Sequence, residues 1–535
     1  MTVDPRSVAG KRLDISAEVQ VLVVGAGPAG IAAAIEAAQR GLVVMLVDEN
    51  PVPWETMAEC VPLHFGGRMA DIVRNRNAMM EAMLAASPAL ETAFELGVDV
   101  RLGTACIGLY TNRDNLNWMP GKIAALVEGE SASTLVRFDE AIVACGRRDM
   151  GIAFEGWEQQ GVLGATAAVS LARRYGALDG RRAVVLGSTA EAVLDALALA
   201  RAGVDVVSLI EQAAEPVASE TLLREVAEAG IAIRCGETVR RAVGDVSAGV
   251  RSIELGNGER IDCDLVVLAV AAVPVVDLLD AAGCRLNFSA ARGGFAPVLG
   301  DDAETSLAGI RAAGDCAGIW AAKSADPAIA EAEGRLAAAA AHRAITGTVS
   351  ASVPTLIEPP AEADFDVGAY RKAWVRATVV ETPHEPNVCL CEEVTAREIL
   401  EVRPPRYLGW TRGANRPSPL SSLLGEAPPH PDQIKRLTRA GMGPCQGRRC
   451  REQVQCLLAL QAELPVSDIP LASYRAPVRP VPLSAAAPTF GAEDPSIRSE
   501  WDSWFGMPRQ WTPFWEVAEH YTVAGLAEAK EHVSE

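Results

Sequence analysis

The fold is decided by residues 19–49, VQVLVVGAGPAGIAAAIEAAQRGLVVMLVDE. An apolar run over 19–24 ends at a glycine-rich turn, an alanine-rich helical pattern continues to Gly41, and a second apolar run ends at Asp48. Strand, glycine turn, helix and strand in this order predict a βαβ unit of the kind that binds dinucleotides.

The residue types in this turn each have a physical reason. Gly25 makes the tight turn, Gly27 lets a pyrophosphate approach the backbone, and Gly30 lets helix and strand pack closely. The phosphates would then lie at the positive N-terminal end of the helix. Asp48 follows Gly25 by 23 residues, where a carboxylate can accept hydrogen bonds from an adenosine ribose. The cofactor-binding residues predicted from this unit are Gly25, Ala26, Gly27, Ala29, Gly30, Asp48 and Glu49.

Length and composition limit the class of protein. A chain of 535 residues has room for about three or four domains, and 49% hydrophobic with 22% charged residues is typical of a globular protein. The net charge of −20 argues against a nucleic-acid or anionic-membrane surface, and no apolar stretch is long enough to span a bilayer. Twelve cysteines, single at first and clustered later, predict reduced thiols in the cytoplasm plus one metal site.

A second nucleotide-type unit opens at residues 182–192, RAVVLGSTAEA. Its helical pattern runs to Ala202, and the next strand pattern ends at Glu211. Gly187 alone of the three fingerprint glycines is kept, because Thr189 and Ala192 carry side chains where close backbone approach is needed. The pattern favours a degenerate NAD domain. A working nicotinamide site is the alternative.

Two later motifs complete the pattern. A buried strand before Gly146 leads into the glycine turn at that residue, and residues 313–315, AGD, precede a long helical pattern over 328–344. Together with GAGPAG and the segments at 154–157 and 161–163, their order resembles the two-dinucleotide-domain flavoproteins of the pyridine nucleotide-disulfide reductase type. The resemblance implies bound FAD, with Gly314 and Asp315 at its ribityl chain. A simple helix N-cap is the alternative role for Asp315.

The chain departs from that group at two places. Cys145 stands where a threonine or serine usually precedes Gly146, and Pro53, Trp54 and Glu55 replace a Pro-Gly-Gly segment. Bulk and negative charge near a pyrophosphate would weaken flavin binding. The favoured interpretation is that this loop has a different role in this chain and that the flavin is still bound.

Four cysteines form two close pairs after a Pro- and Glu-containing linker over 352–366. The pairs are a CxC motif, Cys389 and Cys391, and a Cx4C motif, Cys445 and Cys450. Four thiolates can converge on one centre, and nearby glycines allow a tight loop around it. The motifs resemble the [2Fe–2S] domain of bacterioferritin-associated ferredoxin, although the insert at 407–431 is predicted to protrude as a loop. Structural zinc is the alternative.

The last segment is rich in proline and then in tryptophan. Prolines between 465 and 488 predict an extended, non-helical stretch. Four of the ten tryptophans follow, at 501, 504, 511 and 515. Such an aromatic arm could dock onto another protein or fold back on its own chain.

We therefore predict an α/β fold: a two-dinucleotide-binding-domain flavoprotein with a small C-terminal [2Fe–2S] domain. The expected divisions are 16–150 (FAD-binding, first part), 151–285 (degenerate nucleotide-binding), 286–350 (FAD-binding, return), 385–462 ([2Fe–2S]) and 463–535 (proline- and tryptophan-rich tail).

This combination resembles the flavin subunits of multi-subunit amine and amino-acid dehydrogenases, such as hydrogen cyanide synthase, opine oxidase, hydroxyproline or proline dehydrogenase, and heterotetrameric sarcosine oxidase. The resemblance implies a separate FAD-containing, amino-acid-oxidase-like catalytic subunit, and it allows a small third subunit. This chain would relay electrons, and no catalytic residue is predicted in it. The alternatives are a stand-alone NAD(P)H-dependent reductase feeding an iron–sulfur acceptor, and a scaffold without flavin.

Overall fold

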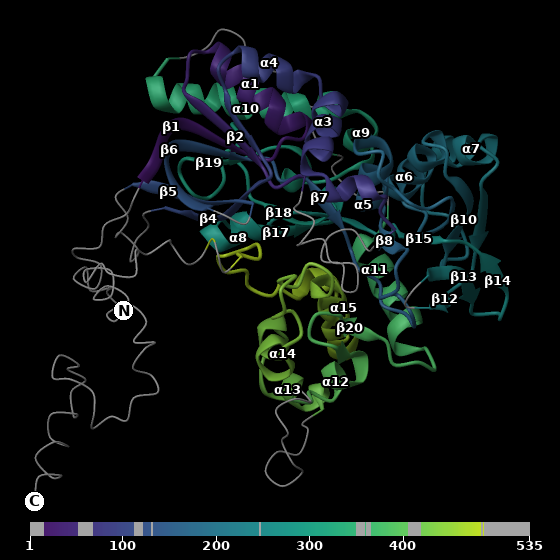
Figure 1. Cartoon of the computed structure of the whole chain (residues 1–535). Helices are drawn as coiled ribbons and strands as arrows, with labels where there is room; N and C mark the ends of the chain where they lie inside the picture. Colours follow the sequence, from purple (N-terminus) through teal and green to yellow (C-terminus); the bar gives the residue numbers. More distant parts are fainter. Residues whose placement is uncertain are drawn as a thin grey trace, which may run out of the picture.

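The computed structural model describes residues 15–51, 68–111, 121–129, 132–245, 248–348, 359, 365–404, 419–482 and 485. Figure 1 shows two α/β parts side by side and a smaller, mostly helical part beneath them. The segment 53–55 and the four tryptophans of the tail lie outside the described residues. Within the described ranges, no helix is both long enough and apolar enough to cross a membrane.

The predicted first βαβ unit is present. It consists of β1 (Ile15–Val24), α1 (Pro28–Gln39) and β2 (Val44–Asp48). Strand β1 pairs in parallel with β2 on one side and with β6 (Ala132–Val143) on the other. The second half of β1 and all of β2 are buried, which explains their continuous apolar sequence.

The first sheet has seven strands in the order β3-β2-β1-β6-β5-β4, and β19 pairs in parallel with the end of β6. The strands β3, β1, β2 and β6 run parallel, whereas β4 and β5 form an antiparallel extension. The chain therefore leaves this sheet after β6 and returns to it through β19. The remaining strands are β3 (Asp99–Leu102), β4 (Thr104–Tyr110), β5 (Lys122–Glu128) and β19 (Ile310–Ala312).

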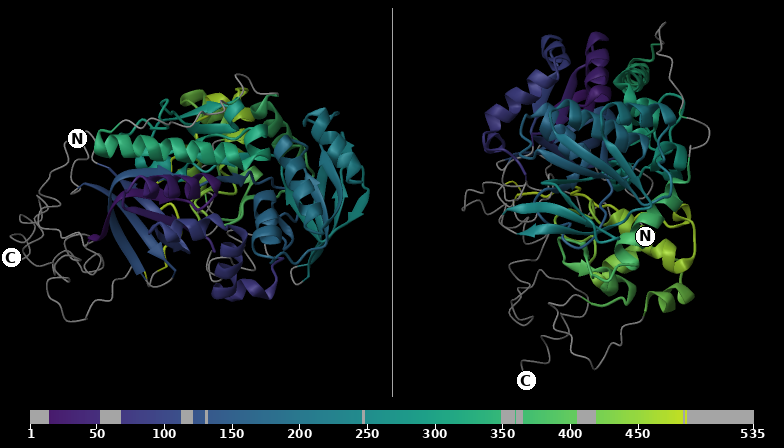
Figure 2. Two further views of the ribbon diagram at one scale, coloured as in Figure 1. Left: turned by 90° about the horizontal axis from the view of Figure 1, so that it is seen from above. Right: turned by 90° about the vertical axis from the view of Figure 1, so that its right-hand side faces the viewer.

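Helix α10 (Pro327–Thr346) lies along α1 over this sheet, as Figures 1 and 2 show. The two helices approach closely because a Cβ at Gly334 would come within 2.0 Å of the carbonyl oxygen of Ala29. The sequence pattern over 78–96 predicts a helix with a break before Pro88, and the structure confirms it as α3 (Arg76–Ala86) and α4 (Ala89–Glu95).

The second α/β part has a five-stranded parallel sheet in the order β11-β10-β9-β15-β8. Helix α6 follows β9, as the sequence pattern predicts, and a three-stranded antiparallel sheet lies beside it. The elements are β8 (Val162–Gly164), α5 (Ala165–Val169), β9 (Arg182–Leu186), α6 (Ala190–Arg201), β10 (Asp205–Glu211), α7 (Glu220–Glu228), β11 (Ala232–Cys235), β12 (Val239–Asp245), β13 (Gly249–Leu255), β14 (Arg260–Asp262) and β15 (Leu265–Leu268).

Short elements join the two parts. Strand β7, which follows the turn after β6, pairs with β16, and β17 pairs with β18. They are β7 (Arg147–Asp149), β16 (Ala272–Pro274), α8 (Asp277–Ala282), β17 (Leu286–Ser289), β18 (Gly294–Pro297), η5 (Gly314–Ala317) and α9 (Ala321–Ala325).

The four-cysteine part is built mainly from helices. Contrary to the predicted protruding loop over 407–431, residues 420–426 form helix α13, because Leu420 is buried in the core of this part. Residues 405–418 of that insert lie outside the described residues. The elements are α11 (Val367–Val375), β20 (Asn387–Cys389), β21 (Val394–Thr395), α12 (Ala396–Leu400), α13 (Leu420–Glu426), α14 (Pro431–Thr438) and α15 (Arg451–Ala462).

After α15 the chain returns to the first sheet. Apart from the short turn η8 (Val466–Asp468), residues 463–482 form no helix, as their prolines predict. Residues 472–479, which we call the strap, run from α14 and α15 to α8 and β4; their colour in Figure 1 is yellow. Thus the described start of the tail folds back on its own chain.

Candidate functional site

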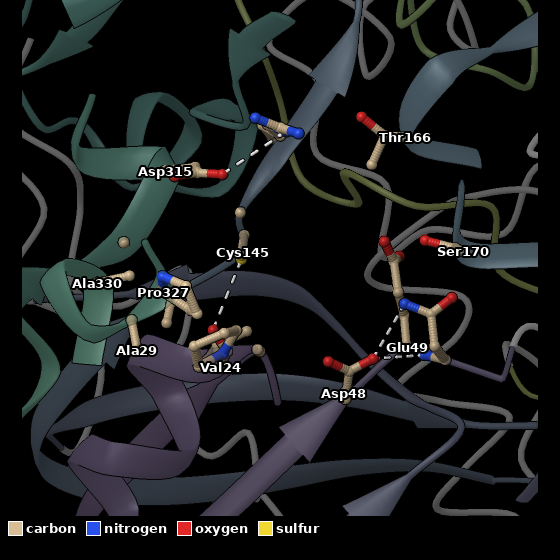
Figure 3. Close-up of a pocket in the computed structure, with 18 of the residues that line it drawn as sticks. Val24, Ala29, Asp48, Glu49, Cys145, Thr166, Ser170, Asp315, Pro327 and Ala330 are labelled. Carbon is tan, nitrogen blue, oxygen red and sulfur yellow. Dashed lines mark hydrogen bonds and ion pairs between the residues drawn. The ribbon is translucent and has the colours of Figure 1, made fainter. Parts of the chain in front are cut away.

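A cavity lies where the sequence places a dinucleotide. It has a volume of about 590 Å³, and its walls come from the ends of β1, β2 and β6, the start of α1, and η5. Of the predicted cofactor residues, Gly25, Gly27, Ala29, Asp48, Glu49, Gly314 and Asp315 line it. Figure 3 shows Asp48 and Glu49 at one side of this cavity, with Asp315 and Ala29 at the other.

The glycine turn leaves backbone exposed to the cavity. Gly25 has φ +110°, and a Cβ there would come within 2.2 Å of the carbonyl oxygen of Ala144. A Cβ at Gly27 would meet no protein atom within 4 Å. The missing side chain at Gly27 therefore leaves room in the cavity and is not needed for packing between protein elements. Gly27 also caps α1 without a side-chain hydrogen bond, which leaves the first N–H groups of the helix for a ligand. These features fit a pyrophosphate.

The two acids at the end of β2 differ in accessibility. Asp48 accepts hydrogen bonds from the backbone N–H groups of Ala26 (2.6 Å) and Asn50 (2.7 Å), and its side chain is buried. Burial raises the pKa of the Asp48 carboxyl, and these two donors oppose that effect. The Glu49 side chain is 33% exposed and lines the cavity. Asp48 therefore holds the glycine turn, and Glu49 is the more accessible acceptor for a ribose.

Asp315 faces the cavity from η5. Its carboxylate lies 3.8 Å from Nε of Arg147, and no side-chain cap hydrogen bond is present at this helical turn. Nearby, the buried Lys323 ammonium bonds both oxygens of Glu333 (2.9 and 3.0 Å), and Glu333 accepts the N–H of Gly314. Asp315 is thus free of a capping role and available to hydroxyl groups of a ligand.

Two buried acids surround Arg147 beyond Asp315. Asp195 lies 3.3 Å from its guanidinium, and Asp149 accepts the N–H and the hydroxyl of Thr166. Burial raises the pKa of Asp149 to about 6 and that of Asp195 to about 7, although Arg147 opposes both shifts. Burial thus shifts the pKa of both carboxyls toward neutral pH, and Asp195 is the one of the two that lines the cavity.

In the corresponding turn of the second unit, a side chain caps the helix. Gly187 keeps the tight turn, with φ +107°, against the backbone of Ala269. The side chain of Thr189, however, accepts the N–H of Ala192 and so caps α6. One N–H of the helix terminus that would face a pyrophosphate is therefore bonded by the protein itself.

The acidic residue that ends β10 in the second unit is also hydrogen-bonded by the protein itself. Glu211 is fully buried, and Oε2 accepts hydrogen bonds from the hydroxyls of Ser188 (2.6 Å) and Tyr370 (2.7 Å). Tyr370 comes from α11, far along the sequence. It therefore takes the position in which a ribose hydroxyl would bond this carboxylate.

The four predicted cysteine ligands come together. The thiols of Cys389 and Cys450 are in hydrogen-bond contact, and so are those of Cys391 and Cys445. The N–H of Gly441 points to Sγ of Cys389 at 3.4 Å. Among the described residues, no three His, Cys, Asp or Glu side chains are arranged to hold a single metal ion. The four thiols instead form two pairs.

Each pair has one thiol with a lowered pKa. The thiol of Cys391 lowers the pKa of Cys445, helped by the backbone N–H groups of Arg449 and Gly447. The thiol of Cys450 lowers the pKa of Cys389 in the same way, helped by the N–H of Gly441. Thiolates are the form that binds iron, so this donor set fits an iron–sulfur group.

The loop between the last two cysteines packs directly against the wall of the cavity. Arg148 donates a hydrogen bond to the carbonyl of Arg448 (2.7 Å) and pairs with Glu452. A Cβ at Gly151 would come within 2.2 Å of the carbonyl oxygen of Arg449. The segment that leaves the cavity after Gly146 is thus in backbone contact with the four-cysteine part.

One buried residue of the cavity was not predicted from the sequence. Arg479, at the end of the strap, lines the cavity and bonds both Glu49 and Asp277. The available signal was an arginine among prolines, in the run RAPVRP over 475–480. This run does not indicate which residues Arg479 would bond.

Known proteins resemble this chain in sequence or in fold. Residues 19–343 match the family described as pyridine nucleotide-disulphide oxidoreductase. An opine oxidase subunit from Agrobacterium tumefaciens (strain Ach5) is 30% identical over 520 residues, which cover 91% of this chain and 94% of the relative. Hydrogen cyanide synthase subunit HcnB of Pseudomonas protegens is 25% identical, with 88% and 97% covered. The solved L-proline dehydrogenase from P. horikoshii has the same fold, with a TM-score of 0.58 at 20% identity over 89% of this chain and 81% of that one.

Proposed function

The chain belongs to the pyridine nucleotide-disulphide oxidoreductase family and is an FAD-dependent oxidoreductase, and we propose that it is the flavin and iron–sulfur subunit of a multi-subunit amine or amino-acid dehydrogenase. In this proposal a partner flavoprotein, resembling amino-acid oxidases, oxidises the substrate, and a small third subunit completes the complex. The chain passes the electrons on to an acceptor. Relatives named as subunits of opine oxidase and hydrogen cyanide synthase, similar over nearly their whole lengths, support the need for partners.

FAD would lie in the cavity beside α1. The N–H groups at the start of α1 would hold the pyrophosphate, with Gly27 giving it room. Glu49 would accept the adenosine ribose hydroxyls while Asp48 keeps the turn in place, and Asp315 would accept ribityl hydroxyls. The residues assigned to this site are Gly25, Ala26, Gly27, Ala29, Gly30, Asp48, Glu49, Gly314 and Asp315. When bound, FAD exchanges electrons in pairs or singly.

The two thiol pairs would hold a [2Fe–2S] cluster. Two irons bridged by sulfide need two thiolates each, and Cys389 with Cys450 and Cys391 with Cys445 supply two contacting pairs. A single zinc ion would instead need all four thiols around one point. The cluster, when bound, exchanges one electron at a time.

One observation carries this proposal. The backbone of the cysteine loop, at Arg449, touches the backbone of Gly151, four residues after Arg147, which lines the FAD cavity. Two cofactor sites joined by so short a segment suit electron transfer between them. A structural metal site far from the flavin would have no need of this contact.

The competing functions need different features of the two nucleotide-type units. A stand-alone NAD(P)H-dependent reductase needs a nicotinamide site, and the hydrogen bonds of Tyr370 and Thr189 argue against one. A scaffold without flavin needs no open turn at Gly27, yet the turn is open. Both observations favour the relay subunit.

The chain would lie in the cytoplasm, where thiol ligands remain reduced. FAD binding takes 16–150 and 286–350, the degenerate nucleotide part 151–285, the cluster part 385–462, and the tail 463–535.

The test is to purify the tagged chain from its native cells with whatever binds it. We expect a second flavoprotein in the complex and, with a panel of amines and amino acids, substrate-dependent reduction of an external dye. The chain alone should be coloured but inactive on the same panel. Activity of the isolated chain with NADH or with an amine would contradict the proposal.

A further inference from the structure

We infer that the strap, residues 472–479, completes the FAD site through Arg479 and thereby couples FAD retention to the integrity of the four-cysteine part. This inference rests on the proposed function, because it assumes FAD in the cavity and a cluster at the cysteines. It assigns a binding role to a residue that lies beyond both cofactor motifs in the sequence.

Arg479 is positioned by two carboxylates at the cavity wall. Its Nε and Nη2 bond the two oxygens of Glu49, the latter at 3.3 Å, and its Nη1 bonds Asp277 on α8. The arginine is buried, while Glu49 remains one-third exposed to the cavity. A carboxylate has about four acceptor positions, so one that accepts from a guanidinium can accept further hydrogen bonds, such as those of ribose hydroxyls. Arg479 therefore fixes the rotamer of the ribose acceptor.

The charges around Arg479 balance. Arg448, from the cysteine loop, lies 3.9 Å from Asp277, so two guanidinium groups face two carboxylates. Although burial raises the pKa of Asp277, Arg479 and Arg448 outweigh it and lower that pKa. Removal of Arg479 would take a guanidinium away from both Glu49 and the buried Asp277.

The strap is attached firmly to the four-cysteine part. Arg451, the first residue of α15 after Cys450, lies over the ring of Tyr474, 3.1 Å from its centroid, and bonds the carbonyl of Ala472. Ser473 donates to Asp432 on α14. Arg448 donates to the carbonyl of Val478 at 3.1 Å. Both Arg448 and Arg451 are therefore placed by the fold of the loop that carries Cys445 and Cys450.

The other edge of the strap bonds the FAD part. The N–H of Val478 donates to the carbonyl of Ile107 on β4 (2.9 Å), and the N–H of Tyr474 donates to Asp280 on α8 (3.0 Å). The strap thus connects the cysteine loop to the cavity wall through a short run of residues that have partners on both sides. Disorder of the cysteine loop should release Arg479 from Glu49.

The first measurement is the FAD dissociation constant of the full chain, obtained by titration of flavin-free protein. Arg479→Gln should weaken FAD by about 10- to 100-fold, the range of a lost charge-assisted hydrogen bond. The exposed Arg475, on the same strap, gives the matched control Arg475→Gln, which should bind FAD like the wild type. Arg479→Lys, which keeps the charge but not the fork, should also weaken FAD and guards against a folding defect in the first variant.

The second measurement tests the coupling. Cys445→Ser should weaken FAD in the wild-type chain and should weaken it much less in the Arg479→Gln chain, because the contact is already lost. Equal FAD affinity of wild type, Arg479→Gln and Arg479→Lys, all with native circular dichroism, would overturn the inference. Additive effects of Cys445→Ser and Arg479→Gln would overturn the coupling. A wild-type chain that binds no FAD would instead contradict the proposed function.

Discussion

The hydroxyl of Tyr370 lies 2.7 Å from Oε2 of Glu211, and this contact distinguishes the second nucleotide-type unit from the first. In the first unit the corresponding acid, Asp48, is also buried but is held by backbone N–H groups, and the next residue, Glu49, is one-third exposed and lines a cavity. In the second unit the acid is fully buried beneath α11. The two units share a fold, but the protein itself fills the ribose position of the second.

We therefore expect that neither NADH nor NADPH reduces the bound flavin at an appreciable rate. The physical reason is that Tyr370 and Thr189 already satisfy the groups that would bind the nucleotide. The measurement is the visible flavin absorption after anaerobic mixing with either nucleotide, and dithionite serves as the positive control. Rapid bleaching by NADH or NADPH would contradict this expectation.

Gly27→Val should abolish FAD binding. The valine side chain would point into the cavity, where a Cβ meets no protein atom, and would occupy the space of the pyrophosphate. The protein itself should still fold, since no packing contact is overfilled. Gly425→Val on the exposed face of α13 is the matched control, because a Cβ there also meets nothing and lies outside the cavity. FAD content per chain is the measurement, and a yellow Gly27→Val protein would refute the placement.

Cys445→Ser should lose both iron and acid-labile sulfide and stop electron flow from the complex to an external acceptor. Single-turnover reduction of the partner's flavin by substrate should survive, because that step needs no thiolate of this chain. Cys235→Ser, distant from the four cysteines in sequence, is the control and should keep its metal. One zinc per chain with no labile sulfide would establish the structural alternative.

The pH dependence of stability should include a contribution from Asp195. Its pKa in the folded protein is raised from 3.8 to about 7, so between these values the folded state holds a proton that the unfolded state has released. Stability from this group is therefore greatest below pH 4 and declines as the pH rises to about 7. The melting temperatures of the wild type and of Asp195→Asn should be measured across this range. That of the wild type should fall relative to that of Asp195→Asn as the pH rises. A constant difference between the two would contradict the raised pKa.

Gly151→Val should loosen the junction between the cavity segment and the cysteine loop. Its Cβ would overlap the carbonyl oxygen of Arg449, and overpacking of this kind costs about 1–3 kcal/mol. The melting temperature should fall by several degrees, whereas Gly425→Val should leave it nearly unchanged. An unaltered melting temperature for Gly151→Val would mean that the junction can shift freely.

Local spacing was sufficient for some features and not for others. The turn at Gly25 and the break before Pro88 depend on residues close in sequence, so their conformations could be predicted from composition and period. The helix α13, in contrast, lies in an insert whose prolines and serines indicated a loop, and burial of Leu420 outweighed that preference.

The long-range contacts of the site could not be predicted. Tyr370 reaches Glu211 across 159 positions, and Arg479 reaches Glu49 across 430. No periodicity or motif at either end encodes such a partner, because a tyrosine or arginine on an apolar segment has many equally suitable acids in a chain of net charge −20. Only the tertiary fold selects one.

The strap also sets an order of events during synthesis. The cavity takes its first strand from residues beginning at Ile15, yet one of its walls includes Arg479. Domains generally fold as they leave the ribosome, N-terminal parts first. Here Arg479 cannot reach Glu49 until the whole four-cysteine part has emerged. A nascent chain would therefore meet its flavin before Arg479 completes the site.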